Sequence, residues 1–161
     1  MQAKPHAEHA WLEQLLGEWT CESTCPPAAD GQPEVTRGAE VVRSLGGLWV
    51  VCEGRGDVPG ASDARWTMTL GYDPRRSRFV GSWFGSMLTN MFAYEGTLDD
   101  AERVLTLETT GPDFEDASKP DRRYRDVIEV RNADERTLTS QMLTDAGEWA
   151  EMMRATYRRT T

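Results

Sequence analysis

The sequence predicts an all-β protein, an antiparallel up-and-down β-barrel of about ten strands preceded by one N-terminal helix. Three observations support this fold class. Short runs of alternating apolar and polar residues recur along the chain, turn residues such as Gly, Pro, Asp and Asn separate them, and helical periodicity is confined to the start. Because the connections are short, neighbouring strands are expected to pair as hairpins, and closure would remove exposed sheet edges. The whole chain, residues 1–161, is expected to form one domain.

The expected helix covers residues 6–16 and precedes a barrel of residues 17–159. Pro5 suits its first turn and Gly17 ends it. We expect this helix to plug or flank one mouth of the barrel with its apolar side. The apolar residues that recur at helical spacing are Ala10, Trp11, Leu12, Leu15 and Leu16.

The central hairpin is the clearest strand pair, because Asp73-Pro74 interrupts two alternating runs and is typical of a turn. Gly, Pro and Asp content predicts loops at residues 26–33 and 55–64, and a polar loop is expected at 111–120. The expected strands are residues 18–25, 35–45, 48–54, 65–72, 78–85, 91–98, 103–110, 123–131, 137–143 and 148–158.

Charge and hydropathy exclude several classes of partner. The net charge is −9, from 18 basic and 27 acidic residues, so the basic face of a nucleic-acid-binding protein is not expected. The one basic cluster, residues 122–125, lies between Asp121 and Asp126 and is interpreted as a solvated edge. No apolar run approaches the ~20 residues of a membrane span, and the N-terminus lacks the apolar segment of a signal peptide. No membrane association and a cytoplasmic location are therefore expected.

The three cysteines are expected to be free, partly buried thiols. Cys21 and Cys25 are four residues apart on an expected strand, so their Cα atoms would lie ~13 Å apart, too far for a disulfide. Cys52 is isolated on another strand. Zinc sites usually have more closely spaced cysteines and more histidines, and no metal site is predicted.

Five short motifs occur in an order that resembles one bacterial family, domain of unknown function 1579. They are LLGEW at 15–19, GGLW at 46–49, GYDP at 71–74, VGSWFGSM at 80–87 and MRATYRR at 153–159. The resemblance covers nearly the whole chain, from about His9 to Arg159. It implies a calycin-type barrel, distantly related to lipocalins, fatty-acid-binding proteins and nitrobindins. It implies no activity, because the family has none established.

Two comparisons with these relatives concern single residues. The family pattern usually has Asp after the Trp–aromatic pair, whereas this chain has Gly85. Nitrobindin-like barrels bind haem through a histidine late in the chain, whereas the histidines here are His6 and His9. No haem and no other cofactor is therefore predicted. His6, His9 and Glu13 form a loose set on the helix, and these residues are expected to be exposed to solvent rather than to bind a metal.

Two kinds of residue could carry chemistry: inward polar side chains, and the aromatic and methionine side chains. A Ser or Cys nucleophile is not expected, because no histidine is placed to activate it. An inward carboxylate shielded by tryptophans could act as a general acid or base, and Glu108 is the preferred candidate among Glu53, Glu95, Glu108, Asp126 and Glu129. Arg154 is a second polar candidate for the lumen. The six tryptophans and seven methionines could pack the core or line an adaptable apolar cavity.

The favoured hypothesis is a binding protein that holds a small, largely apolar ligand inside the barrel. One alternative is an enzyme of isomerase or hydrolase type using an inward carboxylate, and binding is favoured over catalysis. The other alternative is a structural or interaction protein with a filled barrel, which could form a homodimer through an outer sheet face. The expected ligand-binding residues are Trp66, Trp83, Met87, Tyr94, Glu108, Arg125, Gln141 and Arg154.

Overall fold

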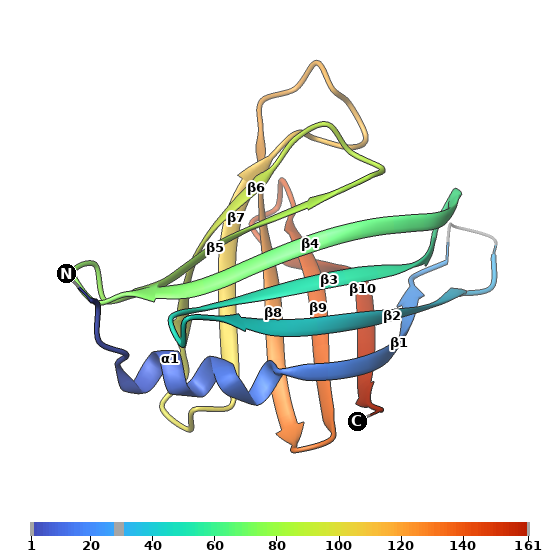
Figure 1. The fold of residues 1–161 in the computed structure, drawn as a ribbon. Helices are drawn as coiled ribbons and strands as arrows, with labels where there is room; N and C mark the ends of the chain where they lie inside the picture. The colour runs from blue at the N-terminus through green and yellow to red at the C-terminus, as the bar shows by residue number, and fades with distance from the viewer. Residues whose placement is uncertain (1, 28–30, 161) are drawn as a thin grey trace.

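A computed structural model describes residues 2–27 and 31–160 of the chain. It confirms the predicted fold class: ten antiparallel strands form a closed barrel, in the order β1-β10-β9-β8-β7-β6-β5-β4-β3-β2. Each strand pairs with its neighbours in sequence, and the pairing of β1 with β10 closes the sheet. Figure 1 shows the helix α1 lying across one end of this barrel.

The boundaries follow the predicted runs closely. The helical segment consists of α1 (Ala7–Leu12) and the 3-10 turn η1 (Glu13–Leu15). The strands are β1 (Gly17–Cys25), β2 (Glu34–Leu45), β3 (Trp49–Val58), β4 (Ala61–Asp73), β5 (Arg78–Gly85), β6 (Phe92–Leu98), β7 (Val104–Gly111), β8 (Arg122–Asn132), β9 (Glu135–Leu143) and β10 (Trp149–Arg159).

The loop predicted at residues 55–64 is wrong for most of its length. β3 continues to Val58 and β4 begins at Ala61, with a register shift between Gly56 and Val58. Gly56 is needed because β2 passes so close that a Cβ there would lie 2.5 Å from the carbonyl oxygen of Arg37. Gly56 therefore marks a close strand approach rather than a loop, whereas Gly60, with a φ of +80°, lies in the turn between β3 and β4. Of the loop predicted at 26–33, residues 28–30 lie outside the described residues.

The N-terminal segment closes one end of the barrel, as predicted, but its helix is shorter than residues 6–16. Trp11, Leu12 and Leu15 are buried, whereas Ala10 is exposed and does not belong to the inward stripe. The Trp11 ring packs edge-on against Phe79, with 6.0 Å between ring centroids. These contacts fill the capped end of the lumen.

The expectation that His9 is exposed to solvent is also wrong, since this residue is only 5% exposed. Its Nδ1 accepts a hydrogen bond from the backbone N–H of His6 at 2.9 Å. Its ring packs edge-on against Tyr72, with centroids 5.8 Å apart. His9 therefore fixes the start of the helix against β4 instead of facing solvent.

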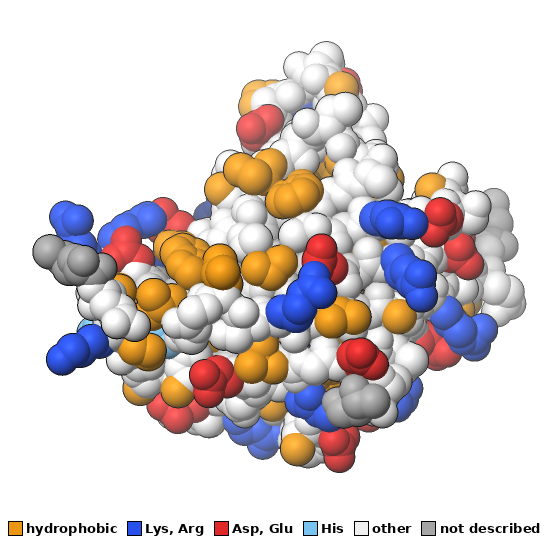
Figure 2. Space-filling model, in the orientation of Figure 1, with side chains coloured by type: hydrophobic (Ala, Val, Ile, Leu, Met, Phe, Trp, Pro, Cys, Tyr) orange, Lys and Arg blue, Asp and Glu red, His pale blue; other side chains and the backbone are white. Residues whose placement is uncertain are grey.

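The outer surface carries mixed charge, and Figure 2 shows positive and negative side chains interspersed with apolar ones on one face. Leu45, Trp49 and Phe84 are large apolar residues exposed on β2, β3 and β5. The homodimer stays a prediction.

None of the helices in the described ranges has the length and apolar character that a membrane-spanning helix requires, and the cytoplasmic location likewise stays a prediction.

Candidate functional site: a cavity in the barrel lumen

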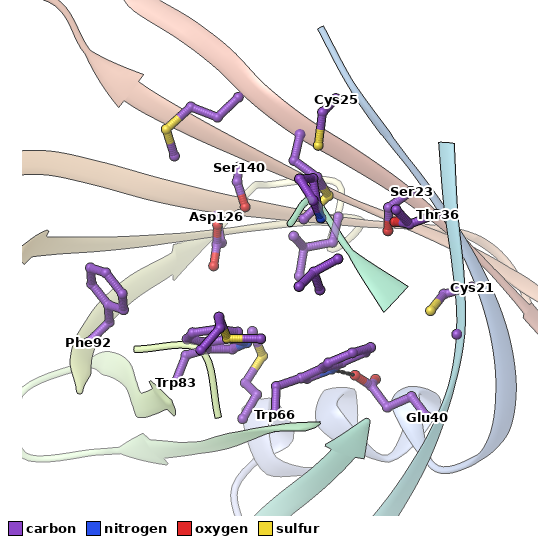
Figure 3. A pocket seen from close by; sticks show the side chains of 18 of the residues that line it. Cys21, Ser23, Cys25, Thr36, Glu40, Trp66, Trp83, Phe92, Asp126 and Ser140 are labelled. Carbon is purple, nitrogen blue, oxygen red and sulfur yellow. Dashed lines mark hydrogen bonds between the residues drawn. The ribbon is translucent and has the colours of Figure 1, made fainter. Parts of the chain in front are cut away.

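The lumen contains a cavity of about 480 Å³ in the half of the barrel away from the helix. Its wall is mainly aromatic and sulfur-containing, and Figure 3 shows several of these side chains around an open space. The apolar side chains of the wall include Trp66, Met68, Trp83, Met87, Leu88, Phe92, Tyr94, Phe114, Tyr124, Leu138, Met152, Met153 and Tyr157.

Strand alternation brings these side chains inward. Trp66 and Met68 are two residues apart on β4, and Phe92 and Tyr94 are two apart on β6, so each pair shares the inner face. Gly54 on β3 lies directly opposite Trp66. A Cβ at Gly54 would lie 2.0 Å from Trp66 Cε2, so the indole ring occupies the space that a side chain would take. This glycine lets the Trp66 indole lie against the barrel wall.

An ion pair between Glu40 of β2 and Arg136 of β9 forms the inner boundary of the cavity. Arg136 Nη2 donates to Glu40 Oε1 at 2.6 Å, and both side chains are at most 5% exposed. Trp66 Nε1 donates to the other carboxylate oxygen at 3.0 Å, as the dashed line in Figure 3 marks. The guanidinium carbon lies 4.0 Å from the Tyr157 ring centroid and 4.8 Å from that of Trp19.

This pair is electrically balanced and mostly hydrogen-bonded. Burial alone would lower the pKa of Arg136, but the Glu40 carboxylate raises it, and the net shift is upward. The Arg136 guanidinium therefore stays protonated, and the Glu40 carboxylate against which it lies balances its charge. Within the described part of the chain, Arg136 Nε has no hydrogen-bond acceptor. Trp19, which stacks on the guanidinium, donates from Nε1 to the carbonyl oxygen of Leu15 at 2.9 Å and so ties the pair to the capped end.

A second carboxylate, Asp126 of β8, also faces the cavity. Ser140 donates to its Oδ1 at 2.5 Å, and the Tyr94 hydroxyl donates to its Oδ2. The residue is partly accessible and lines the cavity. Burial raises the pKa of the Asp126 carboxyl, and the two hydroxyl donors offset only part of that shift. In contrast to Glu40, Asp126 has no cationic partner among its described contacts.

The tyrosines and cysteines of the wall have raised pKa values. Burial, followed by the charge of Asp126 and its hydrogen bond, raises the pKa of Tyr94 well above its usual range. Burial and the Glu40 charge do the same for Tyr157, and they raise the pKa of Cys21 to about 11. The three cysteines are free, as predicted. Within residues 2–27 and 31–160, no group of three or more His, Cys, Asp or Glu residues is placed to hold a metal ion.

The predicted site residues divide into two groups. Trp66, Trp83, Met87 and Tyr94 line the cavity. Glu108, Arg125, Gln141 and Arg154 do not, and the expectation that Glu108 and Arg154 turn into the lumen is wrong. Whether either group binds a ligand stays a prediction.

The four outward residues form surface contacts instead. Arg123 donates to Glu108 at 3.0 Å, and Arg154 donates to Glu151 at 2.9 Å. Arg125 donates to Gln141 at 2.5 Å, and its guanidinium carbon lies 4.2 Å from the Trp149 ring centroid. The reason is strand parity, because Leu107 points inward and Glu108, next to it, must point outward.

Sequence reasoning missed Glu40, Arg136 and Ser140, and it named Asp126 without preferring it. A signal existed for the two carboxylates. Asp126 lies two residues after Tyr124 and two residues before Ile128, and both of these neighbours are buried. Glu40 lies two residues before the buried Val42. An acidic residue in phase with buried neighbours is predicted to face inward, and this test separates Asp126 from Glu108.

Gly85, where the related pattern usually has Asp, lies two residues after Trp83 at the end of β5. A Cβ there would point inward and lie 2.6 Å from Met87 Sδ and 3.0 Å from Trp83 Cη2. A side chain at this position would therefore enter the lumen beside Met87. In this chain that part of the wall is apolar instead.

These features define a closed, ten-stranded antiparallel barrel that is capped at one end by a helix and hollow at the other. The chain belongs to the family described as Protein of unknown function (DUF1579), which matches residues 4–159. No curated protein matches the chain in sequence.

A solved structure supports the barrel fold. The crystal structure of Rv2717c from M. tuberculosis is similar with a TM-score of 0.66 at 14% sequence identity, covering 98% of this chain and 100% of that one. A redesigned beta barrel, b11L5F_LGL, is similar with a TM-score of 0.48 at 9% identity, covering 92% of this chain and 94% of that one. At 14% identity the likeness to Rv2717c shows the barrel fold alone.

Proposed function

We propose that this protein binds a small, largely apolar ligand inside the barrel. The observation that carries the proposal is the hollow half of the lumen, a cavity of about 480 Å³. Ligand sites are typically cavities of about 300–1,000 Å³ with apolar walls and a few placed polar groups. The wall here combines aromatic rings and methionines with Asp126, Ser140 and the Glu40–Arg136 pair.

The composition of the wall supports an adaptable site. Met68, Met87, Met152 and Met153 line the cavity, and methionine side chains adjust to irregular shapes at low cost. Tyrosines and tryptophans provide flat apolar faces together with hydrogen-bond donors. A ligand with an apolar body and one polar end would match this arrangement.

The proposal is tested first with the purified protein and the neutral fluorescent probe N-phenyl-1-naphthylamine. Native mass spectrometry, followed by denaturing extraction, would also detect a molecule carried through purification. We expect saturable binding of one probe per chain. Absence of saturable binding by this probe and by a panel of neutral apolar molecules of similar volume would overturn the proposal.

A matched pair of variants on β1 locates the site. Ser23 lines the cavity, whereas its neighbour Thr24 is exposed. Ser23→Phe places a ring in the lumen and is expected to weaken probe binding by roughly tenfold or more. The ring takes up space in the cavity, so the probe can bury less of its apolar surface there. Thr24→Phe is the control and should leave binding unchanged. Equal effects of the two variants would contradict a lumen site.

A second candidate function is catalysis by an inward carboxylate, and the observation that favours it is Asp126. Its carboxyl faces the cavity, and burial raises its pKa, which suits a general acid or base. An isomerase or hydrolase of this kind would lose turnover in Asp126→Asn while still binding the neutral probe. Turnover that persists in this variant would exclude Asp126 as the acid or base.

A further inference from the structure

We propose that the ligand is an organic cation, a small apolar body carrying one ammonium group that pairs with Asp126. This inference rests on the proposed lumen binding and specifies the chemical class of the ligand. Three features support it: the charge balance of the lumen, the partners of Asp126 and the aromatic wall around that residue.

The interior of the cavity has one carboxylate more than it has cations. Glu40 and Arg136 are paired and cancel. Arg37 and Asp57 also line the cavity, but both are solvent-exposed residues and Arg37 pairs with Glu22 at 3.1 Å, so neither is counted as an interior charge. Among the described lining residues this leaves Asp126 as the interior charge without a counter-ion. A buried carboxylate without a cation is costly, and a bound ammonium group would supply the missing charge.

The contacts of Asp126 leave room for such a partner. Each carboxylate oxygen accepts one hydrogen bond from a neutral hydroxyl, Oδ1 from Ser140 and Oδ2 from Tyr94. A carboxylate has about four lone-pair sites in all, so both oxygens retain acceptor capacity. Figure 3 shows Asp126 beside Ser140, at the edge of the open space that Trp83 and Phe92 also border. An ammonium group in that space could donate to Asp126 without displacing either hydroxyl.

The aromatic wall favours a cation for a second, independent reason. Trp83, Phe92 and Tyr94 line the cavity together with Asp126. Aromatic faces attract cations within about 6 Å of the ring centroid, and the attraction is stronger where water is excluded. The protein already contains such contacts, since Arg136 lies 4.0 Å from the ring centroid of Tyr157.

An anionic ligand is disfavoured by the same geometry. The interior guanidinium, Arg136, already donates to Glu40 and lies between the Trp19 and Tyr157 rings. A ligand carboxylate reaching it would meet the Glu40 charge there, and Asp126 elsewhere in the cavity. Each would repel it, because like charges interact strongly where water is scarce.

The experiment uses three probes that share one apolar body: 1-naphthylmethylamine, 1-naphthylmethanol and 1-naphthylacetate. Their affinities for the wild-type protein are measured by isothermal titration calorimetry at pH 7.5 and low salt. We expect the amine to bind roughly tenfold or more tightly than the alcohol, as a close buried charge pair would produce. We expect the carboxylate to bind most weakly.

Two variants assign the preference to one residue. In Asp126→Asn, which keeps the shape and hydrogen-bonding capacity of the side chain, the amine should fall to the affinity of the alcohol. Glu108→Gln removes one carboxylate from the outer face of the same barrel and should leave the preference intact. Circular dichroism checks that each variant is folded, and the wild-type ratio of amine to alcohol tests the inference even where a variant does not fold.

The outcomes separate this inference from the proposed function. If neither the three probes nor the neutral molecules named above bind, the lumen-binding proposal fails together with the inference, and if only those neutral molecules bind, the inference alone fails. If the alcohol binds as well as the amine, or if the carboxylate binds most tightly, lumen binding stands and the cation is excluded. An amine preference that persists in Asp126→Asn would also overturn the assignment.

Discussion

The two ends of the barrel lumen are lined by the same strands, yet one is filled and the other is hollow. β4 contributes Leu70, fully buried in the core cluster, to the capped end, and it contributes Trp66 to the wall of the cavity. The capped end is filled because Leu12 and Leu15 of the N-terminal segment are inserted there. No such segment among the described residues enters the other end, and the cavity remains.

The difference extends to the buried charges. Glu40, where the two regions meet, has a guanidinium partner and an indole donor, whereas Asp126, in the wall of the hollow region, has only hydroxyl donors. The charge of Glu40 is therefore balanced within the chain, whereas Asp126 has no cationic partner among its described contacts. Under the proposed function, the capped end serves stability and the hollow end serves binding.

The largest expected effect concerns the boundary between the two regions. Arg136→Met leaves Glu40 buried without its cation and should lower the free energy of unfolding by about 3–5 kcal/mol. Adding Glu40→Gln removes the unpaired charge and should recover much of that loss. Urea denaturation followed by circular dichroism measures both variants. If the double variant is no more stable than the single one, the pair is not the coupled unit described here.

The next effect compares packing in the two regions directly. Leu12 is 1% exposed, and Leu12→Ala should lower the unfolding free energy by about 2–5 kcal/mol, because it opens a void in the filled end. Met87 borders the cavity, so Met87→Ala should cost under about 1 kcal/mol, since fewer packed atoms are lost. Equal losses in urea denaturation would mean that the hollow end is packed as tightly as the capped one.

A smaller, pH-dependent effect belongs to Asp126. Burial raises its pKa in the folded protein above the value of about 3.9 that an aspartate has in an unfolded chain. The folded protein then holds this proton more tightly than the unfolded chain. Stability from this group is therefore complete below about pH 4 and is lost as the pH rises through the folded-state pKa. The loss is about 1.4 kcal/mol for each pH unit between the unfolded-state and folded-state pKa values.

The measurement is the difference in unfolding free energy between the wild type and Asp126→Asn at pH 4 and at pH 7.5. The unfolding free energy of the variant should rise relative to that of the wild type at the higher pH, because the Asn side chain cannot ionise. Glu108→Gln, which alters an exposed ion pair with Arg123, should show little change. A pH-independent difference for Asp126→Asn would show that the carboxyl is not desolvated.

The smallest effect is on thiol reactivity and involves no change in stability. Cys21 and Cys25 line the cavity, whereas Cys52 is buried in the core cluster. Burial raises the pKa of the Cys52 thiol far above its usual range. With Ellman's reagent at pH 8, we expect Cys25 to react first, Cys21 slowly and Cys52 only on unfolding.

A bound lumen probe should slow Cys21 and Cys25 and leave Cys52 unaffected. Peptide mass spectrometry after timed labelling distinguishes the three positions. Unchanged labelling rates of Cys21 and Cys25 at a saturating probe concentration would place the probe outside the cavity described here.

Much of the fold could be predicted because alternation and turn residues are local properties of a strand. The runs from 78–85 and 137–143, for example, lie within or coincide with β5 and β9. Which residues of each strand face the lumen is harder to predict, because a shift of one residue exchanges the inner and outer faces. In β10 the register shifts between Glu151 and Met153, so counting residues from the start of the strand at Trp149 does not predict that Arg154 points outward.

The sequence by itself determined the class of fold, the capping role of the N-terminal segment and the abundance of aromatic residues available to line the lumen, since these depend on residue type and spacing. Only the tertiary structure decided which carboxylates are inside, because that depends on register between strands far apart in the chain. Glu40 and Arg136 are 96 residues apart, and Asp126 and Tyr94 are 32 apart. No local pattern encodes such pairs, which form only when the barrel closes.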